Sequence, residues 1–184
     1  MQHLYFLRHC RTILNAQGRI SGVQDSKLCD EAAINNIELF EAKSLIIISS
    51  DLGRCKKTVN LLVPLLETPP LIYYSELLHE RNMGVFEGEK RSELIQKYPY
   101  YFEKMRFRFK MTPPDGESYQ QFQKRIQCFI KKEFTTISNK NKDNILICAH
   151  NQVLKQLYCE LVEVSADEMW GKLDFESGKI KQVY

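Results

Sequence analysis

Short apolar runs separated by longer amphipathic stretches set the pattern of the chain. The runs are rich in Ile and Leu and too short for helices, so they predict strands that are buried on both faces. A weaker run follows the Pro69-Pro70 break, which should end the preceding helix. Together these four predicted strands cover residues 4–7, 45–48, 144–149 and 71–74. Residues 177–184 are expected to form a final strand.

The stretches between these runs carry helical periodicity. In residues 29–41 the apolar side chains recur at the spacing of one helix face, at Ala33, Ile34, Ile37 and Phe40. Pro64 should kink or end a second helix early. Similar stripes predict helices over residues 53–66, 117–137 and 152–162. Alternating strands and helices predict an α/β protein, a three-layer αβα sandwich with a mostly parallel central sheet.

Length and composition narrow the class of protein. The 184 residues suffice for one sizeable core, and we expect a single domain over residues 1–184. No apolar run approaches the ~20 residues of a membrane helix, and the first residues lack the pattern of a secretory signal. The net charge of +3 is too small to favour a nucleic-acid partner. None of the six cysteines forms a C-x-x-C pair or a zinc-like cluster, so we expect free thiols in a reducing cytoplasm.

Charged and imidazole side chains follow three of the predicted strands. Arg8 and His9 end the first strand, Arg54 opens the helix after the second, and His150 follows residues 144–149. Ligands of open α/β sheets bind at the carboxyl ends of the strands, so we expect two imidazoles and two guanidinium groups to converge. Guanidinium matches phosphate oxygens, and imidazole is a nucleophile towards phosphorus near neutral pH. The set predicts phosphoryl transfer, which still needs an acid for the leaving oxygen.

The stretch that supplies an acid also completes a family pattern. Glu80 lies in "LHERNMGVFEG", and the chain resembles the histidine phosphatase superfamily, the phosphoglycerate mutase-like group. "RHCRT" is similar to the family's opening Arg-His-Gly-Glu-Thr, and "ISSDLGRCKKT" to its Ser-Ser-Asp-Leu-x-Arg-x-x-x-Thr. "PPDGES" is similar to its Pro-x-Gly-Glu-Ser turn, and "ILICAHNQ" to the block with its second histidine. The blocks follow the family order over nearly the whole chain.

The resemblance implies a fold, a reaction and a set of roles. The fold would be phosphoglycerate mutase-like, and the reaction would be hydrolysis of a small phosphorylated metabolite without a metal or other cofactor. His9 would be phosphorylated on a ring nitrogen, and Glu80 would protonate the leaving group and then activate water. The groups that would bind the phosphoryl oxygens are Arg8, Asn15, Arg54 and His150.

Three residues depart from the family pattern. Cys10 and Asn151 stand where the family has glycines, and Arg11 stands where it has a glutamate. A glycine is used where the backbone must approach a ligand or adopt a positive φ. We therefore expect Cys10 and Asn151 to narrow the pocket or to shift its loops. These departures leave open a non-catalytic relative that binds phosphorylated ligands.

A phosphoglycerate mutase is the other enzyme that the pattern allows. The Glu80-Arg81 pair favours a mutase, but mutases of this type have a longer insertion before the Pro-x-Gly-Glu-Ser turn. The resemblance implies that residues 89–114 cover the active site and shape its specificity. Within them, basic residues alternate with apolar ones as in a strand, at Lys104, Arg106, Arg108 and Lys110. This stretch either holds a second anionic group of the substrate or forms a solvated basic face.

Overall fold

A central sheet organises the computed structural model, which describes residues 2–36, 44–140 and 143–183. The strand order is β3-β2-β6-β1-β7. Four strands run parallel, and β7 pairs with β1 in the antiparallel direction. The strands are β1 (Leu4–Arg8), β2 (Leu45–Ser50), β3 (Leu71–Ser75), β6 (Asn144–Ala149) and β7 (Ile180–Gln182). The predicted mixed α/β fold with a mostly parallel sheet is confirmed.

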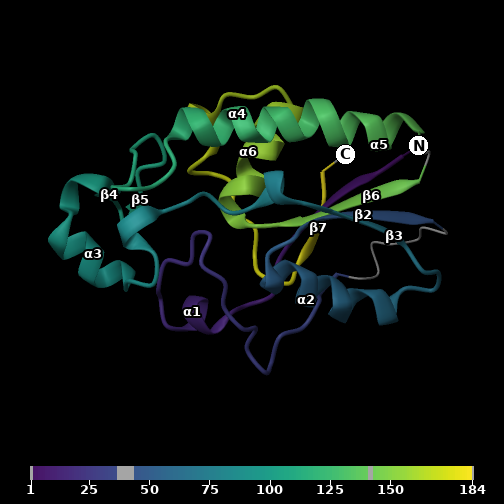
Figure 1. Cartoon of the computed structure of the whole chain (residues 1–184), viewed down its shortest axis with the longest axis horizontal. Coiled ribbons are helices and arrows are strands. Elements are labelled where there is room, and N and C mark those ends of the chain that lie inside the picture. The colour runs from purple at the N-terminus through teal and green to yellow at the C-terminus, as the bar shows by residue number, and fades with distance from the viewer. Residues whose placement is uncertain (1, 37–43, 141–142, 184) are drawn as a thin grey trace.

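Helices cover both faces of the sheet (Figure 1). On one face lie α4 (Tyr119–Phe129), α5 (Thr135–Lys140) and α6 (Asn151–Leu161), and on the other lies α2 (Gly53–Leu62). Successive side chains of a strand point to opposite faces. In β1, Phe6 therefore packs in the cluster that contains Phe122 and Leu154, whereas Leu7 packs in the cluster that contains Val59. Burial on both faces is why these strands read as continuous apolar runs.

Three of the predicted helices form, with adjusted ends. The helix predicted over residues 53–66 ends at Leu62, and a 3₁₀ turn over Val63–Leu65 takes up Pro64, as expected for a proline. The helix predicted over residues 117–137 is α4, which continues through a π-helical turn into α5. Ser118 caps α4: its hydroxyl accepts a hydrogen bond from Gln121 N, and its own backbone N–H donates to the side-chain oxygen of Gln121. The helix predicted over residues 152–162 is α6.

The helix predicted over residues 29–41 is wrong for its first part. Residues 29–36 contain a turn and isolated bridges instead, and residues 37–41 lie outside the described residues. Asn35 receives a hydrogen bond from Ile180 N and donates one to Gly178 O. Pairing with residues 178–180, at the start of β7, thus satisfies the backbone hydrogen-bonding groups of Asn35. Tertiary contacts here override a weak helical preference.

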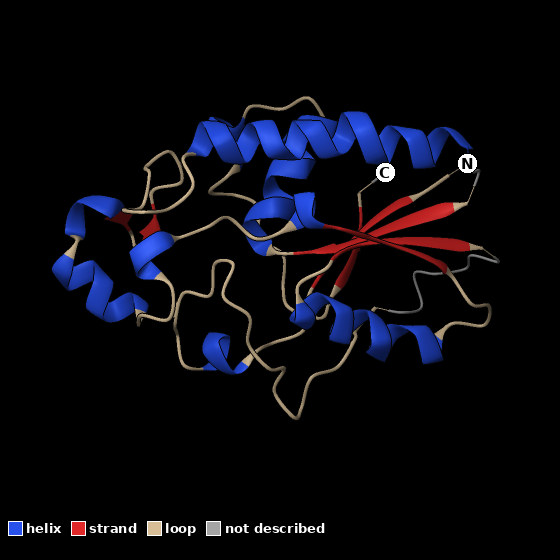
Figure 2. Cartoon of the chain, viewed as in Figure 1, coloured by secondary structure: helices blue, strands red, loops and turns tan. Residues whose placement is uncertain are grey.

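Residues 89–114 form a small lobe beside the sheet, which we call the covering segment (Figure 2). Its elements are α3 (Arg91–Lys97), a 3₁₀ turn (Pro99–Tyr101), β4 (Phe102–Glu103) and β5 (Arg106–Phe107). The strand expected through residues 104–110 is wrong except at β5. Lys104 and Met105 form the turn between β4 and β5, with φ values of 45° and 64°. A two-residue hairpin turn with positive φ matches the twist of the flanking strands.

The remaining elements are short. They are α1 (Ile13–Ala16), α7 (Ala166–Met169) and 3₁₀ turns over Glu76–Leu78 and Gly84–Phe86. Within the described residues, none of the helices is long and apolar enough to cross a bilayer.

Candidate active site

The register of the sheet places the two predicted histidines side by side. In the ladder of β1 and β6, Arg8 lies opposite Ala149, so the next residue of each strand is a histidine. His9 N donates a hydrogen bond to Ala149 O at 3.0 Å, and the centroids of the His9 and His150 rings are 5.2 Å apart. Arg54, in the first turn of α2, donates from Nε to His150 Nδ1 at 3.2 Å. Three residues from distant parts of the chain therefore meet at the carboxyl ends of the strands.

The hydrogen bonds of the His9 ring fix its tautomer. Nδ1 lies 2.7 Å from Cys10 O, and a carbonyl oxygen can only accept, so Nδ1 carries the hydrogen. Nε2 of the neutral ring then carries a lone pair. His9 is buried, with 4% of its surface exposed. A buried imidazole with a free Nε2 is an arrangement suited to nucleophilic attack.

The His150 ring has the opposite tautomer. Its Nδ1 accepts from Arg54 Nε, so the hydrogen of the neutral ring is on Nε2, which lies 3.0 Å from Ser50 Oγ. The sulfur of Cys55 lies 3.6 Å from the same nitrogen. His150 is fully buried at the N-terminus of α6. It is therefore held rigidly by Ser50 and Arg54, and a helix N-terminus favours an anion nearby.

Burial and nearby positive charge keep both imidazoles neutral. The pKa of His9 lies well below its ordinary value, first because of burial and then because of Arg54 and Arg8. The pKa of His150 is also well below the ordinary value, because of burial, Arg54 and the neighbouring His9. An anion bound among these groups would offset the repulsion and raise both values. The site is thus electrostatically prepared for a negatively charged ligand.

A loop closes over Arg54, which is 1% exposed. Its Nη1 donates to Gln24 O at 2.8 Å and its Nη2 to Gly22 O at 2.7 Å. Asp25 accepts from the Arg54 backbone N–H and also lies 3.5 Å from Nη1. These contacts occupy most of the N–H donors of the guanidinium, while its charge remains beside both histidines.

Glu87 holds the same loop from the other side. Its carboxylate accepts from the backbone N–H groups of Val23, Gln24 and Met83, at 2.8–2.9 Å. The sequence analysis assigned no role to this loop of residues 22–25. Nothing in the composition of residues 18–28 shows that carbonyls of this stretch bind the buried arginine.

Arg8 lies at the end of β1 with a buried donor that is unused. Its Nη1 donates to Phe175 O at 3.0 Å, whereas the buried Nε has no hydrogen-bond partner in the described structure. Burial lowers the pKa of Arg8, while the carboxylates of Glu80 and Asp174 raise it. A buried N–H without an acceptor is costly, so this edge of the site is suited to an additional acceptor.

Glu80 lies after β3 and the 3₁₀ turn that follows it, where Arg54 and Arg8 influence its pKa. Its Oε1 accepts from Arg81 N at 3.0 Å, and its Oε2 accepts a longer contact of 3.4 Å from Gln152 N in the first turn of α6. Burial raises the pKa of Glu80 above its ordinary value, against the opposing effect of these hydrogen bonds and of Arg54 and Arg8. A carboxyl with a raised pKa is suited to donate a proton.

Asn15 is placed differently from the other predicted site residues. It lies in α1, where its Oδ1 accepts from Thr12 N and its backbone N donates to Thr12 Oγ1. Its side-chain oxygen thus serves the local capping box. Within the described residues, no hydrogen bond connects Asn15 with either histidine, so its contact with a phosphoryl group stays a prediction.

The two positions where the family has glycines, Cys10 and Asn151, do not require glycine in this fold. Neither Cys10 nor Asn151 is among the described residues with positive φ. The Cys10 thiol lies 3.4 Å from Ala33 O, and Asn151 Oδ1 accepts from Phe175 N at 3.3 Å. Both side chains thus tie neighbouring loops to the site, which is the physical reason that residues larger than glycine fit here. Arg11 is exposed.

Arg81 proves to be an anchor for the covering segment. It is fully buried, and its guanidinium donates to the backbone oxygens of Phe109, Met111 and Glu117. Its side chain is therefore committed to three backbone oxygens. In residues 2–36, 44–140 and 143–183, no cluster of three or more histidine, cysteine or acidic side chains is arranged to hold a metal ion.

Comparisons with known proteins agree with this geometry. The sequence profile of the histidine phosphatase superfamily (branch 1) matches residues 4–181. The adenosylcobalamin/alpha-ribazole phosphatase of Escherichia coli K12 is 28% identical over 174 residues, which cover 91% of this chain and 82% of that protein. The mouse 6-phosphofructo-2-kinase/fructose-2,6-bisphosphatase 1 is 28% identical over 90% of this chain, which spans 34% of the length of that enzyme. The solved structure of a phosphoglycerate mutase from Bacillus anthracis is 25% identical, with a TM-score of 0.73 over 98% of this chain and 86% of that one.

Proposed function

Because the chain belongs to the histidine phosphatase superfamily, we propose that it hydrolyses a small phosphorylated metabolite through a phosphohistidine on His9. The observation that supports this most directly is the tautomer of His9. Its Nδ1–H is held by Cys10 O, so the Nε2 lone pair is free beside His150 and two guanidinium groups. The protein is expected to act in the cytoplasm and to need no metal.

The first step transfers the phosphoryl group to the protein. Nε2 of His9 attacks phosphorus while the bond from phosphorus to the ester oxygen breaks. Glu80, whose pKa is raised by burial, gives its proton to the departing oxygen. Arg8, Arg54 and His150 stabilise the charge on the phosphoryl oxygens, which is the main task in a loose phosphoryl-transfer transition state.

The second step restores the free enzyme. The Glu80 carboxylate takes a proton from water, the water oxygen attacks the phosphohistidine, and the bond from phosphorus to Nε2 breaks. Inorganic phosphate leaves, and both His9 and Glu80 return to their starting states. The same carboxyl thus acts as acid and then as base, which requires that it remain beside the transferred group in both steps.

The covering segment is proposed to shape the pocket for the organic part of the substrate. Arg106 and Phe107 of β5 and Arg91 of α3 line a cavity together with Arg8. The segment belongs to the one catalytic domain that we propose for residues 1–184, because Arg81, directly after Glu80, binds its backbone. Substrate selection then depends on residues next to the reacting centre.

Activity towards p-nitrophenyl phosphate tests the proposal without a known substrate. The wild-type protein is expected to release p-nitrophenol with chelator present, and His9→Ala should lose the activity by at least about 1000-fold because no other group replaces the nucleophile. The matched control is His3→Gln, a histidine at the other end of β1. Full activity of His9→Ala would rule out a phosphohistidine at this position.

Two alternatives give different results in the same assays. A phosphoglycerate mutase would isomerise 3-phosphoglycerate and would be stimulated by a bisphosphate; the likeness to the Bacillus anthracis mutase keeps this test necessary. A non-catalytic relative would bind inorganic phosphate in calorimetry but would turn over neither p-nitrophenyl phosphate nor 3-phosphoglycerate.

A further inference from the structure

A cavity of about 310 Å³ adjoins the proposed phosphoryl site and is lined by four cationic side chains. They come from separate elements: the end of β1, the start of α3, β5 and α6. They are Arg8, Arg91, Arg106 and Lys155, and the carboxylate of Asp174 is the one acidic group of the lining. Arg8 directly precedes His9, so the cavity lies next to the reacting centre.

The cations of this cavity are not paired with carboxylates. Among the described residues, the ion pairs within 4 Å include none of these four side chains. Two other cations of the covering segment differ: Arg108 lies near Glu103, and Lys110 pairs with Asp167. Four cations face the single carboxylate of Asp174, so the cavity has an excess of positive charge, although the same segment pairs its charges elsewhere.

Lys155 is the least expected member of the set. It lies on α6, one helical turn after Asn151, with 6% of its surface exposed. Its Nζ donates to Trp170 O at 3.1 Å, and Arg106 donates to the next carbonyl, Gly171 O, at 2.9 Å. Burial lowers the pKa of Lys155, Asp174 opposes this effect, and Arg106 and Arg8 lower the pKa further. A lysine is rarely buried unless it is paired, and its ammonium group has three N–H donors, of which the structure shows one bound, to Trp170 O.

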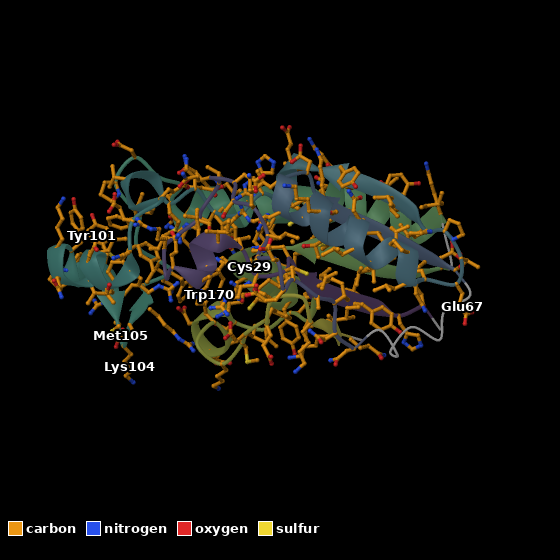
Figure 3. All side chains as sticks on the ribbon, turned by 90° about the horizontal axis from the view of Figure 1, so that it is seen from below. Cys29, Glu67, Tyr101, Lys104, Met105 and Trp170 are labelled. Carbon is orange, nitrogen blue, oxygen red and sulfur yellow. The ribbon has the colours of Figure 1, made fainter. Side chains whose placement is uncertain are left out.

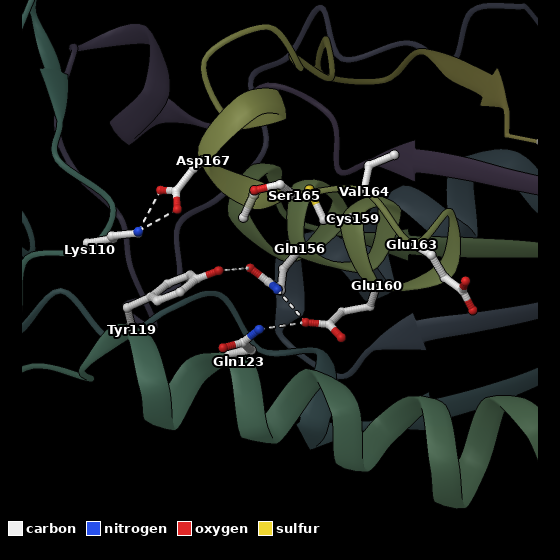
Figure 4. A pocket seen from close by; sticks show the side chains of 11 residues that line it. Lys110, Tyr119, Gln123, Gln156, Cys159, Glu160, Glu163, Val164, Ser165 and Asp167 are labelled. Atoms are coloured by element: carbon white, nitrogen blue, oxygen red, sulfur yellow. Dashed lines mark hydrogen bonds and ion pairs between the residues drawn. The ribbon is translucent and has the colours of Figure 1, made fainter.

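Two other cavities of the described structure are not cationic. The groove in Figure 4, of about 470 Å³, is lined by groups that bind one another. In it, Tyr119 donates to Gln156, which donates to Glu160. The cavity beside Glu80, of about 420 Å³, carries four acidic side chains and one arginine. An anion is therefore favoured in the cationic cavity and disfavoured in these two.

We propose that the cationic cavity is a second anion subsite, and that the substrate is a phosphate ester whose carbon skeleton carries another anionic group, a carboxylate or a second phosphate. The inference rests on the proposed function and narrows its substrate class. The buried N–H of Arg8 without an acceptor lies at the junction of the two sites. Phe107 and Trp170 supply apolar walls for the skeleton between the two anions.

Matched pairs of substrates isolate the effect of the second anion. Glycerol 3-phosphate and 3-phosphoglycerate differ by a carboxylate, and fructose 6-phosphate and fructose 1,6-bisphosphate differ by a phosphate. We expect the dianionic skeleton to have a kcat/KM about tenfold higher or more in at least one pair, the effect of one charge-assisted hydrogen bond. Release of inorganic phosphate is the readout, and the pair that responds identifies carboxylate or phosphate.

Two substitutions test the assigned residues. Lys155→Met and Arg106→Gln should each bring the ratio of kcat/KM within the responding pair close to one. Because the ratio is measured within one variant, a partial loss of folded enzyme cancels. Lys104→Gln is the matched control: Lys104 lies at the tip of the hairpin, pointing away from the body of the molecule (Figure 3), and it should keep the wild-type ratio.

The outcomes separate the subsite from the reaction. Wild-type ratios near one in both pairs, or ratios that survive Lys155→Met and Arg106→Gln, overturn the subsite. If the wild type does not turn over p-nitrophenyl phosphate, the proposed function fails instead. In that case the same pairs are compared by calorimetric affinity, where equal affinities within each pair overturn the subsite and a preference for the second anion supports it.

Discussion

At the scale of single residues, the two histidines are distinguished by what their ring nitrogens contact. Cys10 O holds the hydrogen of His9 on Nδ1, and Arg54 holds the lone pair of His150 on Nδ1. The two rings are therefore opposite tautomers of a neutral imidazole. In the proposed reaction, this difference makes His9 Nε2 the nucleophile and leaves His150 to orient and stabilise the phosphoryl group.

The pH dependence of kcat/KM should reflect the shifted groups. His9 must be unprotonated, and its lowered pKa moves the acid limb below the ordinary histidine range. Glu80 must be protonated, and its raised pKa moves the alkaline limb above the ordinary glutamate range. We expect a bell-shaped profile with an acidic optimum, measured with an alkyl phosphate. An optimum on the alkaline side would contradict the assignment.

Removing the acid should matter most for poor leaving groups. An alkoxide needs a proton as it leaves, whereas p-nitrophenolate does not, so Glu80→Gln should cost about 100-fold to 10,000-fold in kcat/KM with glycerol 3-phosphate and much less with p-nitrophenyl phosphate. Glu76→Gln, on the 3₁₀ turn before Glu80, is the control. Equal losses with both substrates would show that Glu80 does not act as the acid.

At the scale of elements, the sequence pattern predicted secondary structure well where apolar packing determines it. The strands and α6 were predicted closely because their apolar side chains pack into the two hydrophobic clusters on either face of the sheet. The segment 29–36 carried the same kind of stripe, but its backbone pairs with residues 178–180 instead. That pairing joins chain segments far apart in sequence, so no local pattern could predict it.

The candidate site likewise has features that the sequence could predict and features that it could not. The convergence of Arg8, His9, Arg54 and His150 could be predicted, because each follows a strand end. The loop of residues 22–25 over Arg54 and the place of Lys155 could not, because they depend on tertiary contacts. One signal was available for Lys155: it is a cation within the apolar stretch of α6, four residues after Asn151.

Arg81 should be essential for anchoring the covering segment and for the stability of the fold. Arg81→Met leaves the oxygens of Phe109, Met111 and Glu117 without their donor, so we expect a loss of about 3 kcal/mol in the free energy of unfolding. Urea denaturation followed by circular dichroism measures it. The exposed Arg108→Met is the control and should change stability by less than about 0.5 kcal/mol. Equal effects of both substitutions would contradict the anchoring role.

At the scale of the whole molecule, the buried histidines couple stability to pH. The pKa values of His9 and His150 are lowered by folding, so the unfolded chain binds more protons below an ordinary histidine pKa of about 6.5. The free energy of unfolding should therefore fall as the pH decreases through this range. The raised pKa of Glu80 opposes the trend at lower pH.

Substitution identifies the source of this dependence. His150→Asn should flatten the fall in unfolding free energy between about pH 7.5 and pH 5.5, as measured by urea denaturation at each pH. His3→Gln should leave the slope as in the wild type. An unchanged slope in His150→Asn would show that other groups cause the dependence.

The most direct test of the account is to isolate the phosphorylated protein. Glu80→Gln, which slows the attack of water, is mixed with p-nitrophenyl phosphate, quenched in alkali to preserve a phosphohistidine, and analysed by peptide mass spectrometry and ³¹P NMR. We predict one phosphoryl group per chain, attached to Nε2 of His9 and absent when His9→Ala is added. Phosphorylation of His150, or turnover without any phosphorylated protein, would contradict the account.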